Sequence, residues 1–191
     1  MVKIQIDPKA IVYPQPVVLV GATVNNKPNF MVVAAYGMAN NDPPMVSISL
    51  RHSKYTLIGL KQNMSFSVNI PSISLIKETD YCGIVSGSKV DKAKILKFNV
   101  FYGKLANAPL IEQCPVNLEC TVMHILNLGS NAFILGRVEA THIAEYCLTD
   151  GKPDVEKVKT FSYIGRPTSQ YRAIGEIIGK PSSIGRELEV Q

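Results

Sequence analysis

Regular alternation of apolar and polar residues is the strongest pattern along this chain. It is cleanest at residues 116–122 and recurs at residues 46–50 and 65–70. Such alternation is typical of a strand that has one face in the core and the other in solvent. We therefore predict half-buried strands at these three places, and we expect the sheet to continue at residues 133–138 and 140–146.

An apolar run at residues 16–24 ends in a turn signal. Asn25-Asn26 follows this run directly, and asparagine tolerates the left-handed backbone conformation that tight hairpin turns require. Residues 29–36 are again mostly apolar and can return as the partner strand. We predict a β-hairpin here, followed by a break at residues 42–44.

Helical patterns are fewer, and they predict helices at roughly residues 53–63, 72–81 and 171–179. In the last of these, Ile174, Ile177 and Ile178 fall on one face at helical spacing. Several hairpin-sized strands with few helices between them favour an antiparallel barrel over a sheet of βαβ units. The predicted fold is mostly β with peripheral helices, in a single domain that spans residues 1–191.

Composition narrows the class of protein. The chain has 191 residues, of which 46% are apolar and 18% are charged, so it can form a globular domain with a sizeable core. Its net charge of +5 is spread along the whole chain without a basic block. This distribution favours small anionic ligands or acidic partners and argues against a nucleic-acid partner.

Cysteine and histidine spacing gives no sign of a metal site. The cysteines at positions 82, 114, 120 and 147 form no C-x-x-C pair. We expect reduced thiols, most of them buried, with Cys120 in the core because it is in phase with apolar neighbours. The chain shows no signal peptide and no apolar run of membrane-spanning length, so we expect a cytoplasmic protein that does not act at a membrane.

A first segment that suits an anion lies at residues 80–92. It contains two glycines, two serines and two lysines. Backbone N–H groups that a ligand can approach, hydroxyls and ammonium groups together favour a phosphate. The segment has no Walker-type order, and no G-x-G-x-x-G follows a strand elsewhere in the chain. A solvated loop is the alternative interpretation.

A second such segment lies at residues 51–56, directly after the strand at residues 46–50. It opens the predicted helix at 53–63, and a helix N-terminus presents unpaired N–H groups and a positive dipole. Arg51 and Lys54 add formal charge, and Thr56 adds a hydroxyl. The alternative is that Ser53 simply caps the helix.

Taken in order, these segments resemble the flavin reductase-like family, and in particular its flavoredoxin branch. The resemblance extends from about residue 13 to residue 185 and rests on the number and order of short motifs. In this chain they read Tyr13-Pro14-x-Pro16-Val17; Lys27-Pro28-Asn29-Phe30-Met31; Asn41-Asp42-Pro43-Pro44; Ser49-x-Arg51 with Tyr55-Thr56; Asp80-Tyr81-Cys82-Gly83-x-x-Ser86-Gly87 with Val90-Asp91-Lys92; Ala108-Pro109; Asn117-Leu118-Glu119-Cys120; Asp150-Gly151-Lys152-Pro153-Asp154; and Gly179-Lys180-x-x-Ser183-Ile184-Gly185.

The resemblance implies an FMN-binding split β-barrel, a Greek-key antiparallel barrel, assembled as a homodimer with FMN at the subunit interface. It implies that the flavin ring lies along the strand at residues 29–36 and that the phosphate lies near residues 51–56. The cofactor-binding residues that it implies are Asn29, Met31, Val32, Val33, Ala34, Arg51, Ser53, Tyr55, Thr56, Cys82, Ser86, Gly87 and Lys92.

The chain departs from the family pattern at two places. Many flavin reductases have Thr and then Asn-Ser on the ring-binding strand, where this chain has Val32 and Ala34-Ala35. Backbone groups must then hold the ring edge. Family reductases also often carry Gly-Asp-His before the strand that begins near Ala132, where this chain has Gly129-Ser130-Asn131. The missing histidine argues against efficient use of NAD(P)H.

We therefore predict an FMN flavoprotein that passes electrons from a reduced donor, either a redox partner protein or NAD(P)H, to an acceptor. No side chain of the protein need act as an acid or a base. The alternative within the family is an NAD(P)H:flavin oxidoreductase that supplies reduced FMN. Outside it, a flavin-free barrel that binds another ligand or single-stranded nucleic acid would need exposed aromatic residues interleaved with basic ones. The phenylalanines of this chain mostly fit core phases.

Overall fold

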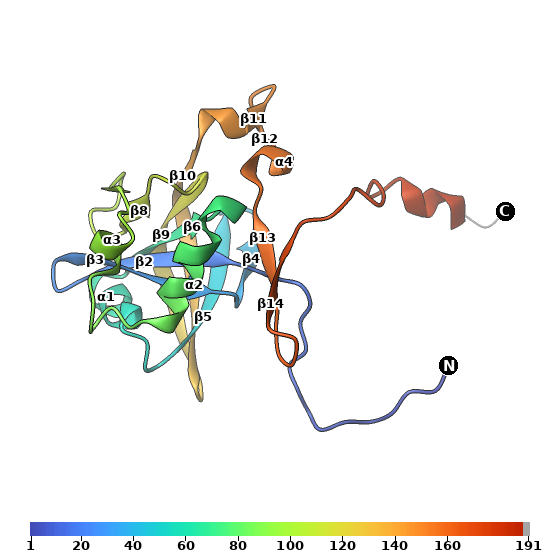
Figure 1. Cartoon of the computed structure of the whole chain (residues 1–191), viewed down its shortest axis with the longest axis horizontal. Helices are drawn as coiled ribbons and strands as arrows, with labels where there is room; N and C mark the ends of the chain where they lie inside the picture. The colour runs from blue at the N-terminus through green and yellow to red at the C-terminus, as the bar shows by residue number, and fades with distance from the viewer. Residues whose placement is uncertain (189–191) are drawn as a thin grey trace.

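A seven-stranded antiparallel sheet forms the centre of the protein. The computed structural model describes residues 1–188. The strands run in the order β3-β2-β6-β9-β10-β5-β4 (Figure 1). Their bounds are β2 (Val18–Val24), β3 (Lys27–Val33), β4 (Tyr36–Asn40), β5 (Met45–Arg51), β6 (Ser65–Ile70), β9 (Val116–Leu128) and β10 (Asn131–Ile143). Each neighbouring pair is antiparallel, as hairpin-sized strands with short connections require.

The sheet curls around one apolar core, and β3 comes close to β5 without pairing to it. The fold is therefore mostly β, an antiparallel split barrel, as predicted. Fully buried side chains from four different strands meet inside it, among them Ile48, Phe66, Cys120 and Ile134. Cys120 lies in this core as predicted. All four cysteines are buried free thiols.

The predicted hairpin at the start of the barrel is confirmed. Asn25 and Asn26 have φ values of 50° and 60°, which is the backbone conformation that matches a two-residue turn to the right-handed twist of its strands. The return strand β3 ends at Val33, before the predicted end at residue 36. The chain then bends, and Tyr36 begins β4, which pairs with β5.

The long hairpin of β9 and β10 is more continuous than its pattern suggests. The alternation at residues 116–122 continues as strand to Leu128. The segments predicted at 133–138 and 140–146 form one strand up to Ile143, followed by a short 3₁₀ turn, η2 (Glu145–Cys147). A register shift between Val138 and Ala140 accounts for the break in the pattern, because a bulge reverses the phase without ending the strand.

Helices cover the sheet on the side of β2 and β3. The predicted helix at 53–63 is α1 (Thr56–Asn63), and that at 72–81 is η1 (Ile73–Leu75) with α2 (Ile76–Ile84). The one-turn helix α3 (Lys92–Ile95) follows. A second apolar cluster, with members such as Leu19, Phe30 and Phe98, lies outside the barrel core and includes Cys82 of α2 and Ala93 of α3. It fixes α2 and α3 against β3.

The predicted C-terminal helix at 171–179 is wrong. Residues Gln170–Ala173 form strand β14, which pairs with β13 (Phe161–Ile164); β1 (Gln15–Pro16) completes this small sheet. Tyr171 packs edge-on against Phe161, with ring centroids 5.4 Å apart. The isoleucines at 174, 177 and 178 are exposed. Helical spacing was insufficient because a short helix depends on packing for its stability, and these isoleucines stay exposed.

The remaining elements are short: β7 (Val100–Phe101), β8 (Leu110–Ile111), β11 (Leu148–Thr149), β12 (Lys152–Pro153), α4 (Val155–Val158) and η3 (Ile184–Leu188). Both terminal segments extend away from the barrel in Figure 1. Within residues 1–188, no helix combines the length and the apolar character needed to cross a membrane.

Candidate functional site

A pocket of about 180 Å³ lies where three parts of the fold meet. It is lined by Met31 of β3, by residues 53–56 at the start of α1, and by residues 82–87 together with Lys92. Strand β3 ends the sheet order, so one edge of its backbone has no neighbouring strand in the described part of the chain. The two segments that the sequence marks as suited to an anion therefore share one pocket, which we call the phosphate pocket.

The start of α1 is not capped. The helix begins at Thr56, its N-cap residue is Tyr55, no side chain accepts a hydrogen bond from its first turn, and no acidic residue lies there. The alternative in which Ser53 caps the helix is therefore wrong, because Ser53 lies in the turn before it. Helix N-termini leave unpaired N–H groups at the positive end of the dipole. In α1 the N–H groups of Leu57 and Ile58 already donate to the carbonyl oxygens of Lys54 and Tyr55, at 3.1 Å each, so the pocket adjoins the positive end of the helix dipole rather than a full set of free donors.

Lys92 is a buried cation at this pocket, with only 3% of its surface exposed. Its Nζ donates to the carbonyl oxygens of Cys82 at 3.2 Å and Val85 at 3.1 Å. Among residues 1–188, no carboxylate lies within ion-pair distance of it. Burial lowers the pKa of Lys92, and the nearby Lys54 lowers it further. A buried ammonium without a counterion is unfavourable, so the site favours an anion.

Asn29 and Thr56 join β3 to α1 beneath the pocket. Both side chains are buried, and Asn29 Nδ2 donates to Thr56 Oγ1 at 2.6 Å. A hydroxyl can accept one hydrogen bond and still donate its own proton. Thr56 lines the pocket, so its O–H can donate to a ligand there.

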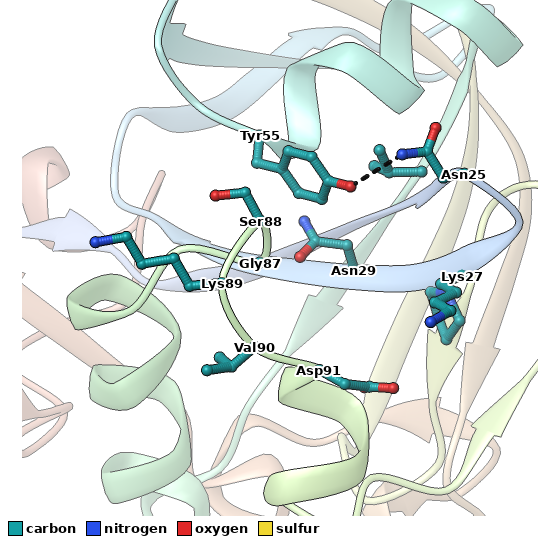
Figure 2. A pocket seen from close by; sticks show the side chains of 11 residues that line it. Asn25, Lys27, Asn29, Tyr55, Gly87, Ser88, Lys89, Val90 and Asp91 are labelled. Carbon is teal, nitrogen blue, oxygen red and sulfur yellow. Dashed lines mark hydrogen bonds between the residues drawn. The ribbon is translucent and has the colours of Figure 1, made fainter.

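Gly87 brings the loop after α2 against this pair. A Cβ atom at position 87 would lie 1.7 Å from Asn29 Oδ1, so only glycine allows this approach. Tyr55 and Gly87 also line a second pocket of about 310 Å³ (Figure 2). Asn25 Nδ2 donates to the Tyr55 hydroxyl at 3.3 Å above this second pocket.

Cys82 lines the phosphate pocket but is unsuited to thiolate chemistry. The residue is only 2% exposed. Burial raises the pKa of its thiol to about 11, against the smaller opposing effect of Lys92. The thiol therefore stays protonated near neutral pH, and thiolate is the reactive form. Cys82 contributes shape and a backbone carbonyl to the site.

The structure places most of the predicted site residues at one pocket and the others apart from it. Eight of them line the phosphate pocket: Met31, Ser53, Tyr55, Thr56, Cys82, Ser86, Gly87 and Lys92. Asn29 reaches it through Thr56. Val32 and Ala34 instead line a separate pocket of about 390 Å³ with Asp80 and Tyr171, while the side chain of Val33 faces the barrel core. Val33 can therefore contact a ligand only through its backbone N–H and C=O groups.

Arg51 also lies outside these pockets. It is the last residue of β5, and its side chain is exposed. Its carbonyl oxygen accepts from Lys54 N–H at 3.0 Å and so helps to form the turn before α1. A contact between Arg51 and a phosphate stays a prediction.

Residues that the sequence analysis did not name as cofactor-binding complete the site. Gly83, Ile84 and Val85 line the phosphate pocket as the end of α2 and the residue after it. In the sequence the helical pattern stops at residue 81, because no apolar stripe continues beyond it. The N-terminal hairpin also contributes Asn25 and Lys27 to the second pocket, and only the tertiary fold brings that turn near residue 87.

Comparison with known proteins identifies the family. A family model described as flavin reductase like domain matches residues 11–152. The chain belongs to the flavin reductase-like family. Two solved flavoredoxin structures place this flavin reductase-like protein in the flavoredoxin branch. That of Methanosarcina acetivorans is 40% identical, with a TM-score of 0.94, and the alignment covers 98% of this chain and all of that one.

The second, the flavoredoxin of Desulfovibrio vulgaris (Miyazaki F), is 30% identical with a TM-score of 0.89, and the alignment covers 96% of this chain and all of that one. A protein of Archaeoglobus fulgidus is 31% identical over 130 residues, which are 68% of this chain and 72% of that protein. Membership of the flavin reductase-like family makes this chain a flavin-binding redox protein.

Proposed function

We propose that this protein holds FMN by its phosphate and passes electrons between a reduced donor and an acceptor. The observation that carries the proposal is the buried ammonium of Lys92, which has no carboxylate partner within residues 1–188 and lies beside the uncapped start of α1. A phosphate dianion would satisfy both features, since N–H groups at a helix start and a lysine are common phosphate ligands.

The residues present fit the rest of the cofactor as well. Met31 and the free edge of β3 continue from the phosphate pocket, and backbone N–H and C=O groups there can pair with the polar edge of a flavin ring. At residues 32, 34 and 35 this chain has valine and two alanines, so the binding role falls to the backbone. When bound, the flavin supplies the redox chemistry, and the protein supplies position and electrostatics.

None of the protein's side chains is assigned a proton-transfer role in this proposal. The Cys82 thiol stays protonated near neutral pH. The residues of the pocket bind and orient: Lys92 and the start of α1 offset the phosphate charge, and the Asn29–Thr56 hydrogen bond keeps β3 and α1 together. Fixed backbone dipoles at the β3 edge would stabilise negative charge that develops on the ring side of the site.

We also propose that the protein acts as a homodimer with the cofactor at the subunit interface. Apolar side chains of both terminal segments are exposed, including Ile11 and Val12 before β1 and Ile177 and Ile178 after β14. Large exposed apolar surface is typical of an interface. Light scattering coupled to size exclusion would give twice the chain mass for a dimer, and a monomer at micromolar concentration would refute this assembly.

The alternative function is an NAD(P)H:flavin oxidoreductase. Its support is the family itself, whose model is named for flavin reductases. Against it stands the β9–β10 turn, where Gly129-Ser130-Asn131 replaces the Gly-Asp-His that family reductases often carry. Steady-state oxidation of NADH and NADPH with added FMN separates the two functions. A rate no faster than the protein-free control supports the electron carrier.

The proposal itself is tested on purified protein reconstituted with FMN. We expect a flavin absorption spectrum that survives gel filtration, and rapid bleaching on anaerobic reduction. The reduced protein should then pass electrons to a one-electron acceptor such as cytochrome c faster than an equal concentration of free reduced FMN under the same conditions. A protein that elutes without flavin after incubation with excess FMN would overturn the proposal.

A further inference from the structure

A third pocket, of about 390 Å³, lies at the C-terminal end of β3, and we call it the tyrosine pocket. It is lined by Val17, Val32, Ala34, Asp80, Tyr163, Ser169 and Tyr171. Apolar and aromatic side chains with few polar groups are typical of a small-molecule site. Among these lining residues Asp80 alone carries a charge, so it dominates the electrostatics of the pocket.

The tyrosine pocket continues the line of the phosphate pocket along β3 and α2. On β3, Met31 lines the phosphate pocket, whereas Val32 and the following Ala34 line the tyrosine pocket. The same order holds on α2, where Gly83 lines the phosphate pocket and Asp80, about one turn earlier, lines the tyrosine pocket. The two elements are in close contact between the pockets, because a Cβ atom at position 83 would lie 2.7 Å from Val32 Cγ1.

This order matches the parts of FMN. Asn29 bonds to Thr56 at the phosphate pocket, and Ala34 lies five positions further along the chain. At 3.3 Å per residue, these positions span about 16 Å. That distance leads from a phosphate along a five-carbon chain to a fused ring system. A phosphate held at Lys92 therefore puts the flavin ring at the tyrosine pocket.

Asp80 is held at this pocket by a tyrosine that is distant in the sequence. Tyr171 Oη donates to Asp80 Oδ1 at 2.9 Å. Ring contacts fix Tyr171 itself, with centroids 5.4 Å from that of Phe161 and 5.8 Å from that of Tyr163. Burial, and then the hydrogen bond to Asp80, raise the pKa of Tyr171. The hydroxyl therefore stays protonated at neutral pH and remains a donor.

The charge of Asp80 has no other partner nearby. Among residues 1–188, no basic side chain lies within ion-pair distance of its carboxylate. Reduction adds electrons to a flavin ring, and a carboxylate close to the ring opposes the added negative charge. Because Asp80 is exposed, solvent screens much of this interaction, and the expected effect is modest.

We propose that Asp80, held in place by Tyr171, lowers the reduction potential of the bound flavin and so makes the reduced protein a stronger electron donor. This inference rests on the proposed function, because it takes the phosphate of FMN to be held at Lys92. Asp80 acts on the ring through its charge, and Tyr171 is a positioning residue that acts through Asp80. The β13–β14 hairpin, which carries Tyr171, thereby takes part in the electron-transfer site.

The test is the midpoint potential of the protein loaded with FMN, measured by anaerobic equilibration with a reference dye. Asp80→Asn removes the charge and retains the size and an acceptor for Tyr171. We expect the equilibrium constant for reduction to rise about three- to tenfold, which for a two-electron couple is a shift of about 14–30 mV to more positive potential. Asp80→Glu retains the charge and should leave this constant within about twofold of wild type. Asp150→Asn, in the exposed turn between β11 and β12 and outside the three pockets, makes the same chemical change and is the matched control.

Two further readouts distinguish an electrostatic effect on the ring from a structural one. Asp80→Asn should tighten the binding of reduced FMN by the same factor as the potential shift and leave the dissociation constant of oxidised FMN within about twofold. Riboflavin has the same ring, so the same shift of potential is expected with riboflavin, whereas a change at Lys92 acts on the phosphate. High salt should reduce the shift, because it screens exposed charges.

Tyr171→Phe tests the positioning role. It removes the hydroxyl and retains the aromatic ring, so the hairpin should fold, which thermal unfolding verifies. The exposed carboxylate of Asp80 can then turn into solvent, and the potential should move in the same direction as in Asp80→Asn but by less. In the Asp80→Asn background the same substitution should have no further effect, because Tyr171 acts through the carboxylate.

The outcomes separate this inference from the proposed function. Bound FMN whose potential is unchanged in Asp80→Asn, or shifted to more negative values, would overturn the role of Asp80 and leave FMN binding intact. An equal shift in Asp150→Asn would also overturn it. Equal shifts from Tyr171→Phe in both backgrounds would overturn the positioning role. Protein that binds no flavin would overturn the proposed function itself.

Discussion

Replacing Lys92 by methionine should uncouple the protein from the phosphate of FMN without removing its affinity for the flavin ring. The ammonium has three N–H donors, and the carbonyls of Cys82 and Val85 use two of them. The third is available to a ligand in the pocket. Methionine has a similar length and fits a buried apolar environment, but it carries no charge.

The expected size of the effect follows from this contact. A hydrogen bond to a charged group contributes about 1.5–3 kcal/mol, which corresponds to about a ten- to hundredfold change in dissociation constant. The Lys92→Met variant should lose that factor for FMN. Riboflavin has the same ring but no phosphate, so its affinity should stay within about twofold. The FMN-to-riboflavin affinity ratio therefore isolates the phosphate contact.

The assay is a fluorescence titration of wild type and variant with both flavins at one ionic strength. Lys94→Met is the matched control, because Lys94 is on the same short helix but exposed. Thermal unfolding without flavin verifies that the variants fold; the apo form of Lys92→Met should be about as stable as wild type, because it no longer buries an unpaired charge. Equal losses for FMN and riboflavin, or an unchanged ratio, would refute the reasoning.

Three further predictions concern the residues around the pocket. Thr56→Val should lower the free energy of unfolding by about 1–3 kcal/mol, because the buried Asn29 Nδ2 loses its acceptor. The same variant should weaken the binding of FMN more than that of riboflavin. A denaturation curve that matches wild type would contradict the first expectation. Gly87→Ala should cost about 1–3 kcal/mol, since its Cβ would overlap Asn29 Oδ1, whereas Gly175→Ala, with open space around it, should cost little. Burial alone would raise the pKa of Glu119, but hydrogen bonds from His142 and the Leu105 N–H outweigh it and lower that pKa below its ordinary 4.5. The ionised form of Glu119 therefore stabilises the fold above pH 4.5, and this contribution is lost as pH falls through the lowered folded pKa. The Glu119→Gln variant should be less stable than wild type at neutral pH, and its unfolding free energy should fall less steeply in acid. Parallel acid-unfolding curves of the two proteins would contradict this.

The barrel was predictable because its signals are local. Alternation at 46–50, 65–70 and 116–122 identified three strands, and Asn25-Asn26 identified a turn, since both depend on residues next to each other in the chain. The β13–β14 hairpin was not predictable from periodicity. Its strands are held by cross-strand packing of Tyr171 on Phe161, whereas the isoleucines beyond it have helical spacing but stay exposed.

The candidate site was predictable in its chemistry but not in its geometry. The residue types at 51–56 and 80–92 indicated two anion-friendly segments. Three features follow from tertiary packing: the two segments meet in one pocket, the start of α1 is uncapped, and no carboxylate of residues 1–188 lies within ion-pair distance of Lys92. The same packing leaves Arg51 at the exposed end of β5 and brings the hairpin turn at Asn25 beside Gly87. No local pattern carries that information.

A crystal structure of the protein soaked or co-crystallised with FMN tests the central claim most directly. We predict a phosphate oxygen within about 3.2 Å of Lys92 Nζ, with a second oxygen at hydrogen-bonding distance from the first N–H groups of α1 or from Thr56 Oγ1. FMN bound with its phosphate in bulk solvent or in another pocket, and Lys92 still bonded only to carbonyl oxygens, would contradict the claim.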